Sequence, residues 1–575
     1  MIFSVWAPNA KSVELIAGGQ RVALRALDSG YWQAEVAVDR RDGYRYSIDG
    51  AAPLPDPRSR WQPAGVHGAS HIWPLPAHMS EGGRFTPAAL NEAVIYELHI
   101  GTFTAQGTYA AAQTKLPHLC ALGVTHVELM PLATFPGRHG WGYDGVDLFA
   151  PFPGYGTPAE LAALVQACHA CGLAVLLDVV YNHLGPDGNY LAQFGPYFTE
   201  RYSTGWGAAI NYDGAHSDEV RRFVIDNARM WLRDYGFDGL RLDAVHAIFS
   251  FEALHVLEEL SAAVKALGEE LKREFVLIAE SDLNDPRLVH SVARGGYGLD
   301  AHWADDFHHA IHRFFTGENQ GYYADFHGLR DVATALRDGY VYQGQYSAFR
   351  GRRHGRAPQG VAARQLVVSA QNHDQIGNRA QGERLSMMLD LPELKAIAAL
   401  TLLSPFVPLL FQGEEWGAAT PFQYFTDHQD PELGRLVAEG RSREFSAFRW
   451  QGAIPNPQDP ATFARSKLDW TELSLPRHAE LFDWYRKLIR LRRDRVRTPR
   501  ESRADSQKSE VDFDAAAEWL AFVHNGVLAV FNLGDRAQCI PMPAGEWRLV
   551  LRSDAPQAWP VDAVAPRATL IYLGG

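Results

Sequence analysis

Short apolar segments alternate with longer segments of helical periodicity through most of this chain, from about residue 94 to residue 495. Residues 174–180 form a nearly continuous apolar run, as expected for a strand that is covered on both faces. Residues 158–171 carry apolar side chains at helical spacing, and Gly172 stands just beyond them, where helices commonly end. Strands that alternate with helices in this way predict parallel βα units.

Eight strands of this kind can be counted along the chain. They are predicted at residues 94–100, 126–130, 174–180, 239–243, 275–280, 299–303, 366–370 and 406–411. Eight parallel βα units indicate an α/β protein with a (β/α)8 TIM barrel, which we place over residues 90–495. The barrel is expected to carry long loop insertions, the longest of them at residues 184–216 after the third strand. A helix is predicted over residues 109–122 and another over 479–493.

The two ends of the chain show a different pattern, with short alternating segments and turn residues between them. Residues 12–17, 31–36 and 42–50 predict an N-terminal β-sandwich over residues 1–85, immunoglobulin-like and similar to a carbohydrate-binding domain. Residues 519–523, 526–532 and 568–573 predict a C-terminal antiparallel β domain over residues 505–575.

Composition narrows the class of protein. The net charge is -13 over 575 residues, and no Lys/Arg-rich run appears beyond Arg352, Arg353 and residues 490–500, which argues against a nucleic-acid partner. No apolar run reaches the length of a membrane span, and the N-terminus lacks a signal-peptide pattern. The four cysteines are too few and too scattered for a disulfide framework, so we expect a reducing, cytoplasmic location. Cys168 and Cys171 lack a second pair, and we predict no metal and no cofactor.

Candidate chemistry begins at residues 239–246, where Arg241 and Asp243 lie on one face of a predicted strand. A guanidinium beside a carboxylate keeps the carboxylate ionised and oriented, as a nucleophilic aspartate requires. For this segment taken alone, a purely structural ion pair is an equal alternative.

Polar side chains also follow the other strands, at the edge of the barrel where active sites lie. Burying so many charged groups without a ligand would cost several kcal/mol each, so we expect them to surround a polar ligand. Trp141, Tyr143 and Trp206 would add aromatic walls, which suits a carbohydrate. The residues at these strand ends are Asp178, His183, Arg241, Asp243, Glu280, Asp305, Asp306, His308, His309, Asn372, His373, Asp374 and Gln375.

Glycoside cleavage needs one ionised carboxylate and one protonated carboxylic acid. Asp243, beside Arg241, is expected to be ionised. Glu280 follows an apolar strand and is the better candidate for a raised pKa.

Four segments resemble the signature regions of the α-amylase superfamily, in the right order: residues 178–183, 239–243, 278–280 and 371–374. The resemblance implies that Asp243 is the nucleophile, Glu280 the general acid/base and Asp374 a carboxylate that stabilises the transition state. It also implies retention of configuration through a covalent glycosyl-enzyme. It places four further residues around the cleaved sugar: Tyr143, His183, Arg241 and His373.

Within this superfamily, a sandwich before the barrel is similar to branching enzymes, isoamylases and trehalohydrolases. Residues 55–60, 65–68, 243–248, 305–309 and 373–379 are most similar to the maltooligosyltrehalose trehalohydrolase family. That resemblance implies cleavage of the α-1,4 bond next to the terminal trehalose of maltooligosyltrehalose, malto-oligosaccharides as further ligands, and functional pairing with a maltooligosyltrehalose synthase. The substrate-binding candidates that it adds are His246, Asp305, Asp306, His308, His309, Gln375 and Asn378.

Two positions deserve comparison with simple α-amylases. His246 stands where those enzymes often carry lysine, so contacts to the leaving group are expected to differ. Asn182 stands where amylases use an asparagine to bind calcium, but no matching set of ligands follows from the sequence.

Two alternatives remain. A glycogen-branching or α-amylase-type enzyme would share the barrel, and a branching enzyme would pass the glycosyl unit to a sugar hydroxyl. A barrel retained only for glycan binding would lack its catalytic residues, but all three carboxylates are present.

Overall fold

Eight parallel strands close into a barrel in the computed structural model, which describes residues 1–73, 85–205, 207–447, 454–496, 509–554 and 563–574. Neighbouring strands around the barrel follow the order β11-β14-β15-β16-β19-β20-β7-β8. All eight predicted strands are confirmed, each with slightly closer bounds. They are β7 (Ile95–Leu98), β8 (His126–Leu129), β11 (Ala174–Val179), β14 (Gly239–Leu242), β15 (Val276–Ala279), β16 (Ala301–Trp303), β19 (Leu366–Ser369) and β20 (Val407–Phe411).

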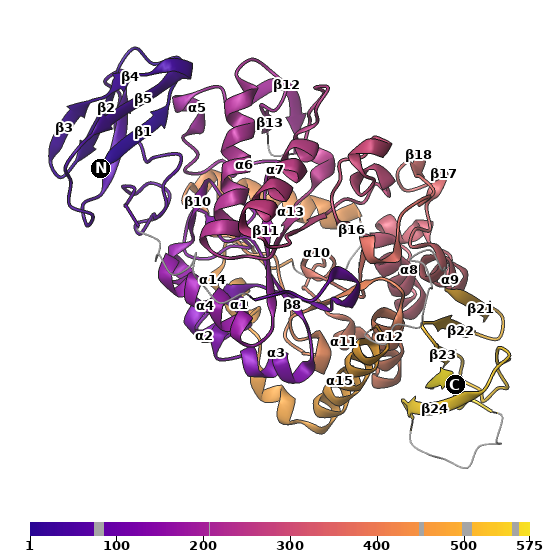
Figure 1. The fold of residues 1–575 in the computed structure, drawn as a ribbon. Coiled ribbons are helices and arrows are strands. Elements are labelled where there is room, and N and C mark those ends of the chain that lie inside the picture. Colours follow the sequence, from indigo (N-terminus) through magenta and orange to yellow (C-terminus); the bar gives the residue numbers. More distant parts are fainter. Residues whose placement is uncertain (74–84, 206, 448–453, 497–508, 555–562, 575) are drawn as a thin grey trace.

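Helices cover the outside of the barrel (Figure 1). The first of the well-formed ones, α4, begins with a capping box, in which Thr157 and Glu160 satisfy each other's backbone N–H groups. The helices that follow the strands include α4 (Pro158–Ala170), α6 (Ser217–Asp234), α7 (Val256–Leu271), α8 (Asp305–Thr316), α9 (Leu329–Asp338), α12 (Leu391–Leu403) and α15 (Pro476–Val496).

The single helix predicted over residues 109–122 is wrong. The structure has two helices there, α2 (Tyr109–Gln113) and α3 (Leu116–Leu122). Pro117 lies in the first turn of α3, a position that tolerates proline, whereas in the interior of one long helix it would remove a hydrogen bond and clash with the preceding turn. The predicted end of the helix at residue 122 is confirmed, since Gly123 follows α3 in a left-handed conformation that ends the helix.

Two three-stranded antiparallel sheets precede the barrel, in the orders β1-β5-β4 and β3-β2-β6. They face each other, because Phe3 of one sheet and Tyr44 of the other make an edge-to-face contact at 5.1 Å. Arg58 and Arg60, which follow these sheets, form ion pairs with Asp226 and Asp234 of α6. The strands are β1 (Ile2–Trp6), β2 (Val13–Ala17), β3 (Gln20–Ala23), β4 (Arg25–Ala26), β5 (Tyr31–Glu35) and β6 (Tyr44–Ile48).

A five-stranded antiparallel sheet ends the chain, in the order β21-β22-β23-β25-β24. It lies at the opposite side of the barrel from the N-terminal sheets (Figure 1). The predicted domain boundaries fall close to residues 74–84 and 497–508, which are outside the described residues. The strands are β21 (Glu510–Asp514), β22 (Trp519–His524), β23 (Val527–Asn532), β24 (Trp547–Arg552) and β25 (Thr569–Gly574).

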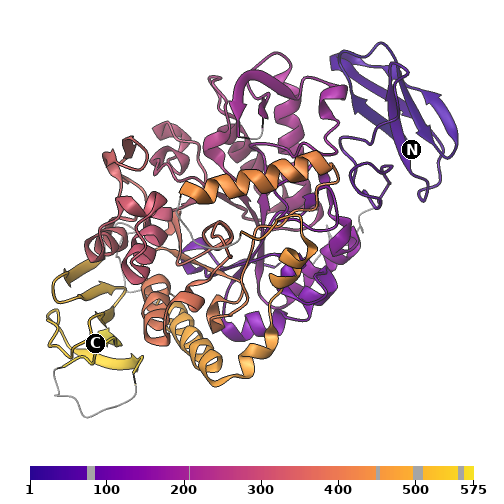
Figure 2. The same cartoon turned by 180° about the vertical axis from the view of Figure 1, so that it is seen from behind.

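The prediction that residues 184–216 form the longest loop of the barrel is wrong. Residues 184–216 contain α5 (Leu191–Phe194) and a hairpin of β12 (Phe198–Thr204) and β13 (Gly207–Ile210), but the segment between β20 and α15, residues 412–475, is longer. This segment includes α13 (Pro431–Ala447), which crosses the barrel (Figure 2), and α14 (Pro460–Arg465). Most residues of α13 are polar, so its sequence shows little apolar periodicity. The length of this segment was therefore not recognised from the pattern.

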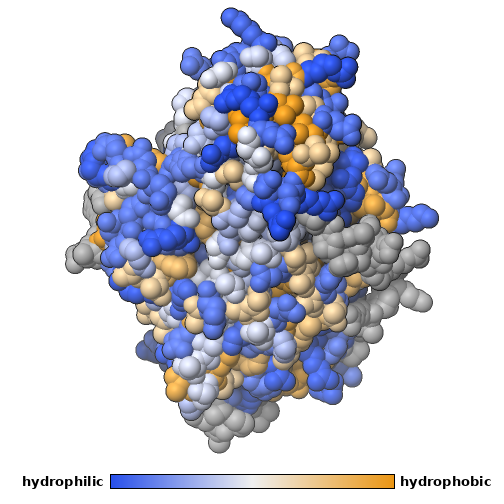
Figure 3. Space-filling view, turned by 90° about the vertical axis from the view of Figure 1, so that its left-hand side faces the viewer, coloured by the Kyte–Doolittle hydropathy of each residue, from blue (hydrophilic) through white to orange (hydrophobic). Residues whose placement is uncertain are grey.

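Among the described residues, no helix combines the length and the apolar character needed to cross a bilayer. The face of the molecule shown in Figure 3 is mainly hydrophilic, with hydrophobic residues gathered mostly in a limited area toward the top.

Candidate active site

Arg241 organises the carboxylates at the barrel's C-terminal edge. Strand register sets Asp178 of β11 beside Arg241 of β14, and Leu242 beside Ala279 of β15, so Asp243 and Glu280 emerge as neighbours. The Arg241 Nη1 atom donates to Asp243 Oδ1 at 2.7 Å and to Asp178 Oδ2 at 2.9 Å, while Nη2 lies 3.8 Å from Glu280 Oε2. One buried guanidinium therefore touches or faces three carboxyl groups from three strands.

The same guanidinium leaves Asp243 and Glu280 with opposite pKa shifts. Burial alone would raise the pKa of Asp243, but Arg241, His183 and a 2.7 Å hydrogen bond from Asn182 Nδ2 bring it below its ordinary value. Burial raises the pKa of Glu280 to about 7, because Arg241 is farther from it and Asp243 repels its charged form. The pair supplies an ionised carboxylate and an acid that retains its proton to near neutral pH.

The turn after Asp243 is strained in a way that serves Glu280. Ala244 adopts a left-handed conformation, with φ 38° and ψ 50°, which is uncommon for a residue other than glycine. Its backbone N–H donates to Glu280 Oε2 at 2.6 Å. The strained turn thus positions the Glu280 carboxyl group from the loop that carries Asp243.

His373, Tyr143 and Asp178 form a chain of hydrogen bonds beside this pair. The Tyr143 hydroxyl lies 2.6 Å from Asp178 Oδ2 and 2.7 Å from His373 Nε2. Burial lowers the pKa of a histidine, but Asp374 and Glu97 outweigh it and raise that of His373 to about 9. Burial raises the pKa of Asp178 to about 7 against the effect of Arg241.

Exposure separates the groups that can touch a ligand from those that position them. The side chains of Asp243 and Glu280 are each 13% exposed and that of Asp374 is 42% exposed. Arg241 and Asp178 are at 0% and 1%. Asp243, Glu280 and Asp374 are therefore the members of the cluster that a sugar can reach, and Arg241 and Asp178 act from beneath.

Other predicted site residues lie close by. Both ring nitrogens of His183 are within hydrogen-bond distance of protein oxygens, those of Asn182 and of the Tyr143 carbonyl. Asn182 Nδ2 donates to Asp243, and Asn182 Oδ1, the oxygen that a calcium ion would bind, lies against His183 Nδ1. His246 is exposed in the turn after β14 and faces both Glu280 and Asp282.

The segment at the start of α8 divides between the site and the barrel wall. Asp305 faces Glu280, Asp282 and Asp374, and burial together with these acids raises its pKa well above its ordinary value. Asp306 points the other way and accepts hydrogen bonds from Asn284 Nδ2 and from two backbone N–H groups, each at 2.8 Å.

The expected contacts of His308 and Gln375 with substrate find no support in the geometry. His308 is buried between the Ala370 carbonyl at 2.5 Å and the Tyr323 hydroxyl at 2.9 Å. Gln375 closes a capping box with Asn372 at the start of α10 (His373–Gly377). These two side chains, like Asp306, have their polar groups engaged by the protein, because buried polar atoms require partners.

His309 and Asn378 take intermediate positions. His309 is buried and packs against the ring of Tyr322 at 4.5 Å. Asn378 accepts a 2.8 Å hydrogen bond from Arg441 Nη1, which ties the loop after β19 to α13. Trp141 is buried and packs edge-on against His373 at 5.6 Å, while Trp206 lies outside the described residues.

Sequence reasoning missed several residues that border this site. Asp282 follows Glu280 by two residues, and this spacing was a signal that could have revealed it. Arg350 pairs with Asp282 at 3.0 Å from the loop between β17 (Gln343–Ser347) and β18 (Arg352–Gly355), and no local pattern announces that contact.

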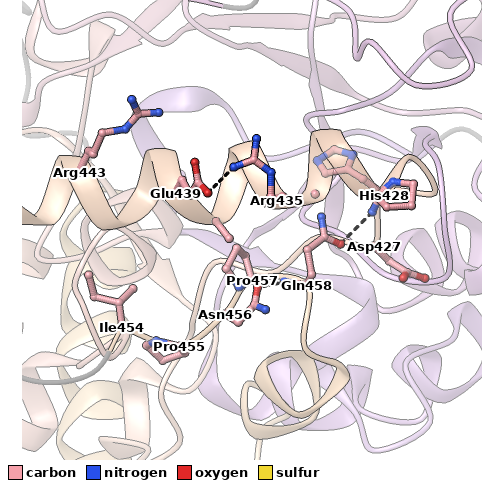
Figure 4. A pocket seen from close by; sticks show the side chains of 13 residues that line it. Asp427, His428, Arg435, Glu439, Arg443, Ile454, Pro455, Asn456, Pro457 and Gln458 are labelled. Carbon is pink, nitrogen blue, oxygen red and sulfur yellow. Dashed lines mark hydrogen bonds and ion pairs between the residues drawn. The ribbon is translucent and has the colours of Figure 1, made fainter.

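A groove of about 1020 Å³ lies between α13 and residues 454–458, lined by His428, Arg435 and Gln458 among others (Figure 4). Its edge reaches the loop that carries Tyr143, since His428 Nε2 is 3.9 Å from Asp144 Oδ2. None of the three reachable carboxylates lines it. The carboxylate cluster around Arg241, and not this groove, is therefore the candidate active site.

The closed barrel and its paired carboxylates define a glycoside-cleaving barrel of the α-amylase class. A family model described as "Alpha amylase, catalytic domain" matches residues 83–203. A crystal structure from Salmonella typhimurium, named "Putative alpha Amylase", is 35% identical and superposes with a TM-score of 0.91, covering 100% of this chain and 97% of that one.

Two relatives narrow the class. Malto-oligosyltrehalose trehalohydrolase from Rhizobium sp. (strain M-11) is 50% identical, over 96% of this chain and 94% of that protein. The protein of the same name from Mycobacterium tuberculosis (strain ATCC 25618 / H37Rv) is 46% identical, over 96% of both. The chain belongs to the malto-oligosyltrehalose trehalohydrolase family of α-amylase-type glycosidases.

Proposed function

We propose that this protein hydrolyses the α-1,4 bond next to the terminal trehalose of maltooligosyltrehalose and releases trehalose and a maltooligosaccharide. The observation that carries the chemistry is the pair of opposite pKa shifts on Asp243 and Glu280 around one guanidinium. The names of the relatives support the choice of substrate.

Each step of the reaction has a group suited to it. Glu280 gives its proton to the glycosidic oxygen while the ionised Asp243 attacks the anomeric carbon, which breaks the bond and forms a covalent glycosyl-enzyme. Glu280 then takes a proton from water, and this water releases the sugar from Asp243. Asp374, at the exposed side of His373, stabilises the positive charge that develops on the sugar ring.

The leaving trehalose requires hydrogen-bonding groups beyond the acid. His246, Asp305 and Asp282 surround Glu280 on that side and are the groups that we assign to it. Asp306, His308 and Gln375 are reassigned to the support of the site, because their polar atoms already have protein partners.

The products test this proposal. We expect maltooligosyltrehalose to yield free trehalose, and maltohexaose to be cut much more slowly. New branch points without a gain in reducing ends would indicate a branching enzyme instead. Equal rates on both substrates would indicate a general amylase, and early NMR spectra should show the released reducing sugar as the α anomer.

We further propose that the enzyme works with a synthase that creates the trehalose end of a maltooligosaccharide, since hydrolysis alone cannot supply that substrate. A cytoplasmic location fits the free cysteines Cys120, Cys168, Cys171 and Cys539. Release of trehalose from a maltooligosaccharide only when both enzymes are present would support the pairing.

A further inference from the structure

Glu97 of β7 binds His373 twice. Its Oε2 accepts a hydrogen bond from the His373 backbone N–H at 3.1 Å, and its Oε1 bonds to the His373 Nδ1 atom. Both side chains are 1% exposed. A carboxylate bonded to both the backbone and the ring of one histidine fixes the direction in which the opposite ring nitrogen, Nε2, points.

Counting hydrogens along this chain decides the charge of the ring. Glu97 Oε2 already accepts from the His373 backbone N–H, and we assign the hydrogen of the second contact, to Glu97 Oε1, to His373 Nδ1. Asp178 receives Arg241 Nη1 on both oxygens, at 3.0 and 2.9 Å, so the Tyr143 hydroxyl donates to Asp178. Tyr143 has no second hydrogen, so it accepts from His373 Nε2, which carries one as well. With both nitrogens protonated, the ring is a cation.

On these contacts, and resting on the function proposed above, we infer that Glu97 is a positioning residue that keeps His373 in its cationic form during catalysis. Nothing in the sequence patterns drew attention to Glu97.

Other charged and titratable groups face His373 from the surrounding elements, and they define the control. Glu128 of β8 stands beside Glu97 in the strand register, is fully buried, and has no hydrogen-bond partner on either carboxyl oxygen within the described part of the chain. Burial and the nearby Glu97 raise the pKa of Glu128 well above its ordinary value, which favours its uncharged form, and within the described residues neither of its carboxyl oxygens bonds to the His373 ring. The groups facing His373 are Glu97, His99, Glu128, Tyr143, Asp178, Arg241 and Asp374.

The substitution Glu97→Gln tests the inference on the pH dependence of kcat/KM for maltooligosyltrehalose. A glutamine can still accept from the His373 backbone but no longer stabilises a charged ring, so His373 should lose its proton at lower pH. Glu280, with a pKa of about 7, sets the start of the basic limb, and deprotonation of His373, whose pKa is about 9, adds a second and steeper fall at higher pH. We expect this steeper part of the limb to move down by about one pH unit or more, and the loss relative to the unmodified enzyme to grow with pH. Removal of a negative charge near Glu280 lowers the pKa of that acid and would move the start of the limb, whereas earlier loss of the His373 proton moves only its steeper part.

Three variants make the result decisive. Glu128→Gln mimics a neutral acid and should leave the limb in place. Adding Glu97→Gln to His373→Gln should move the limb no further, because the titrating ring is gone. If Glu97→Gln does not fold, as checked by its melting temperature, Glu97→Asp should shift the limb in the same direction by less.

An unchanged limb in a folded Glu97 variant, or an equal loss at every pH, would overturn the inference and leave Glu97 a purely structural role. Failure of the unmodified enzyme to cut maltooligosyltrehalose would instead reject the proposed function. The two failures are therefore distinguishable.

Discussion

The ends of β14 and β15 and the first turn of α8 carry similar side chains but use them differently. Asp243 and Glu280 remain partly exposed above a buried guanidinium. In α8, Asp305 faces these acids whereas Asp306 is buried and accepts three hydrogen bonds from the barrel wall. Successive helical residues point about 100° apart, so only one of two adjacent acids can face the site.

A polar residue near the end of a barrel strand does not have to belong to the site. A side chain one position past a barrel strand projects toward the open end. Once a helix has begun, some of its polar side chains point away from the site into the protein, where they must find hydrogen-bond partners. Substitutions of residues that face the site and of residues that support it should therefore differ in their effects on activity and on stability.

Removing either member of the catalytic pair should nearly abolish activity. Asp243→Asn cannot form the covalent intermediate, and Glu280→Gln cannot donate a proton, an effect worth roughly 10² to 10⁴ in rate. Melting temperatures close to that of the unmodified enzyme would show that both variants fold. Residual kcat/KM above about a tenth in either variant would contradict these roles.

The pH profile should reflect the opposite pKa shifts. Glu280 acts as an acid only while protonated, so kcat/KM should fall about tenfold per pH unit above its pKa of about 7. Asp243 must be ionised, and because its pKa lies below the ordinary value of 3.8, the acidic limb should appear only at lower pH. The measurement is kcat/KM from pH 3.5 to 9 by reducing-sugar release. A basic limb well below pH 6 would contradict the assignment of Glu280.

Asp306→Ala should affect stability, because it removes the acceptor of the Val341 and Tyr342 backbone N–H groups and one of the two acceptors of the Asn284 amide. The cost is on the order of 3 kcal/mol. We expect a lower melting temperature by thermal unfolding, with little change in the substrate preference of the protein that stays folded.

The matched variant Asp305→Asn should show the reverse. No backbone N–H group within the described ranges is found donating to the Asp305 carboxyl group, so stability should change little, while kcat/KM on maltooligosyltrehalose should fall. If both variants were equally destabilised and equally active, the division of α8 between wall and site would be incorrect.

His246→Ala should give the smallest effect, a change in preference. His246 is exposed beside Glu280 and Asp282, so its loss should slow the trehalose-ended substrate more than maltohexaose, by several-fold. The ratio of kcat/KM for the two substrates measures this. An equal loss on both would place the specificity elsewhere.

Residue patterns predict the barrel and place its candidate catalytic carboxylates at one edge. Continuous apolar runs reveal strands covered on both faces, and all eight appear in the structure. Because parallel strand ends gather at one edge, Asp243, Glu280 and Asp374 could be assigned to one site from their positions alone. The split of residues 109–122 at Pro117 was also encoded locally, although helical periodicity obscured it.

Contacts between distant segments, and not the local sequence, distinguish the polar residues that can face a ligand from those that support the site. Asp306, His308 and Gln375 carry the same chemistry as true site residues, but their partners come from segments far away or from a helix cap. Glu97 lies 276 positions from His373, and its role depends on closure of the barrel. The local sequence pattern indicates the periodicity of helices and strands. Hydrogen-bond partners, and the burial that shifts a pKa, depend instead on contacts between residues distant in sequence.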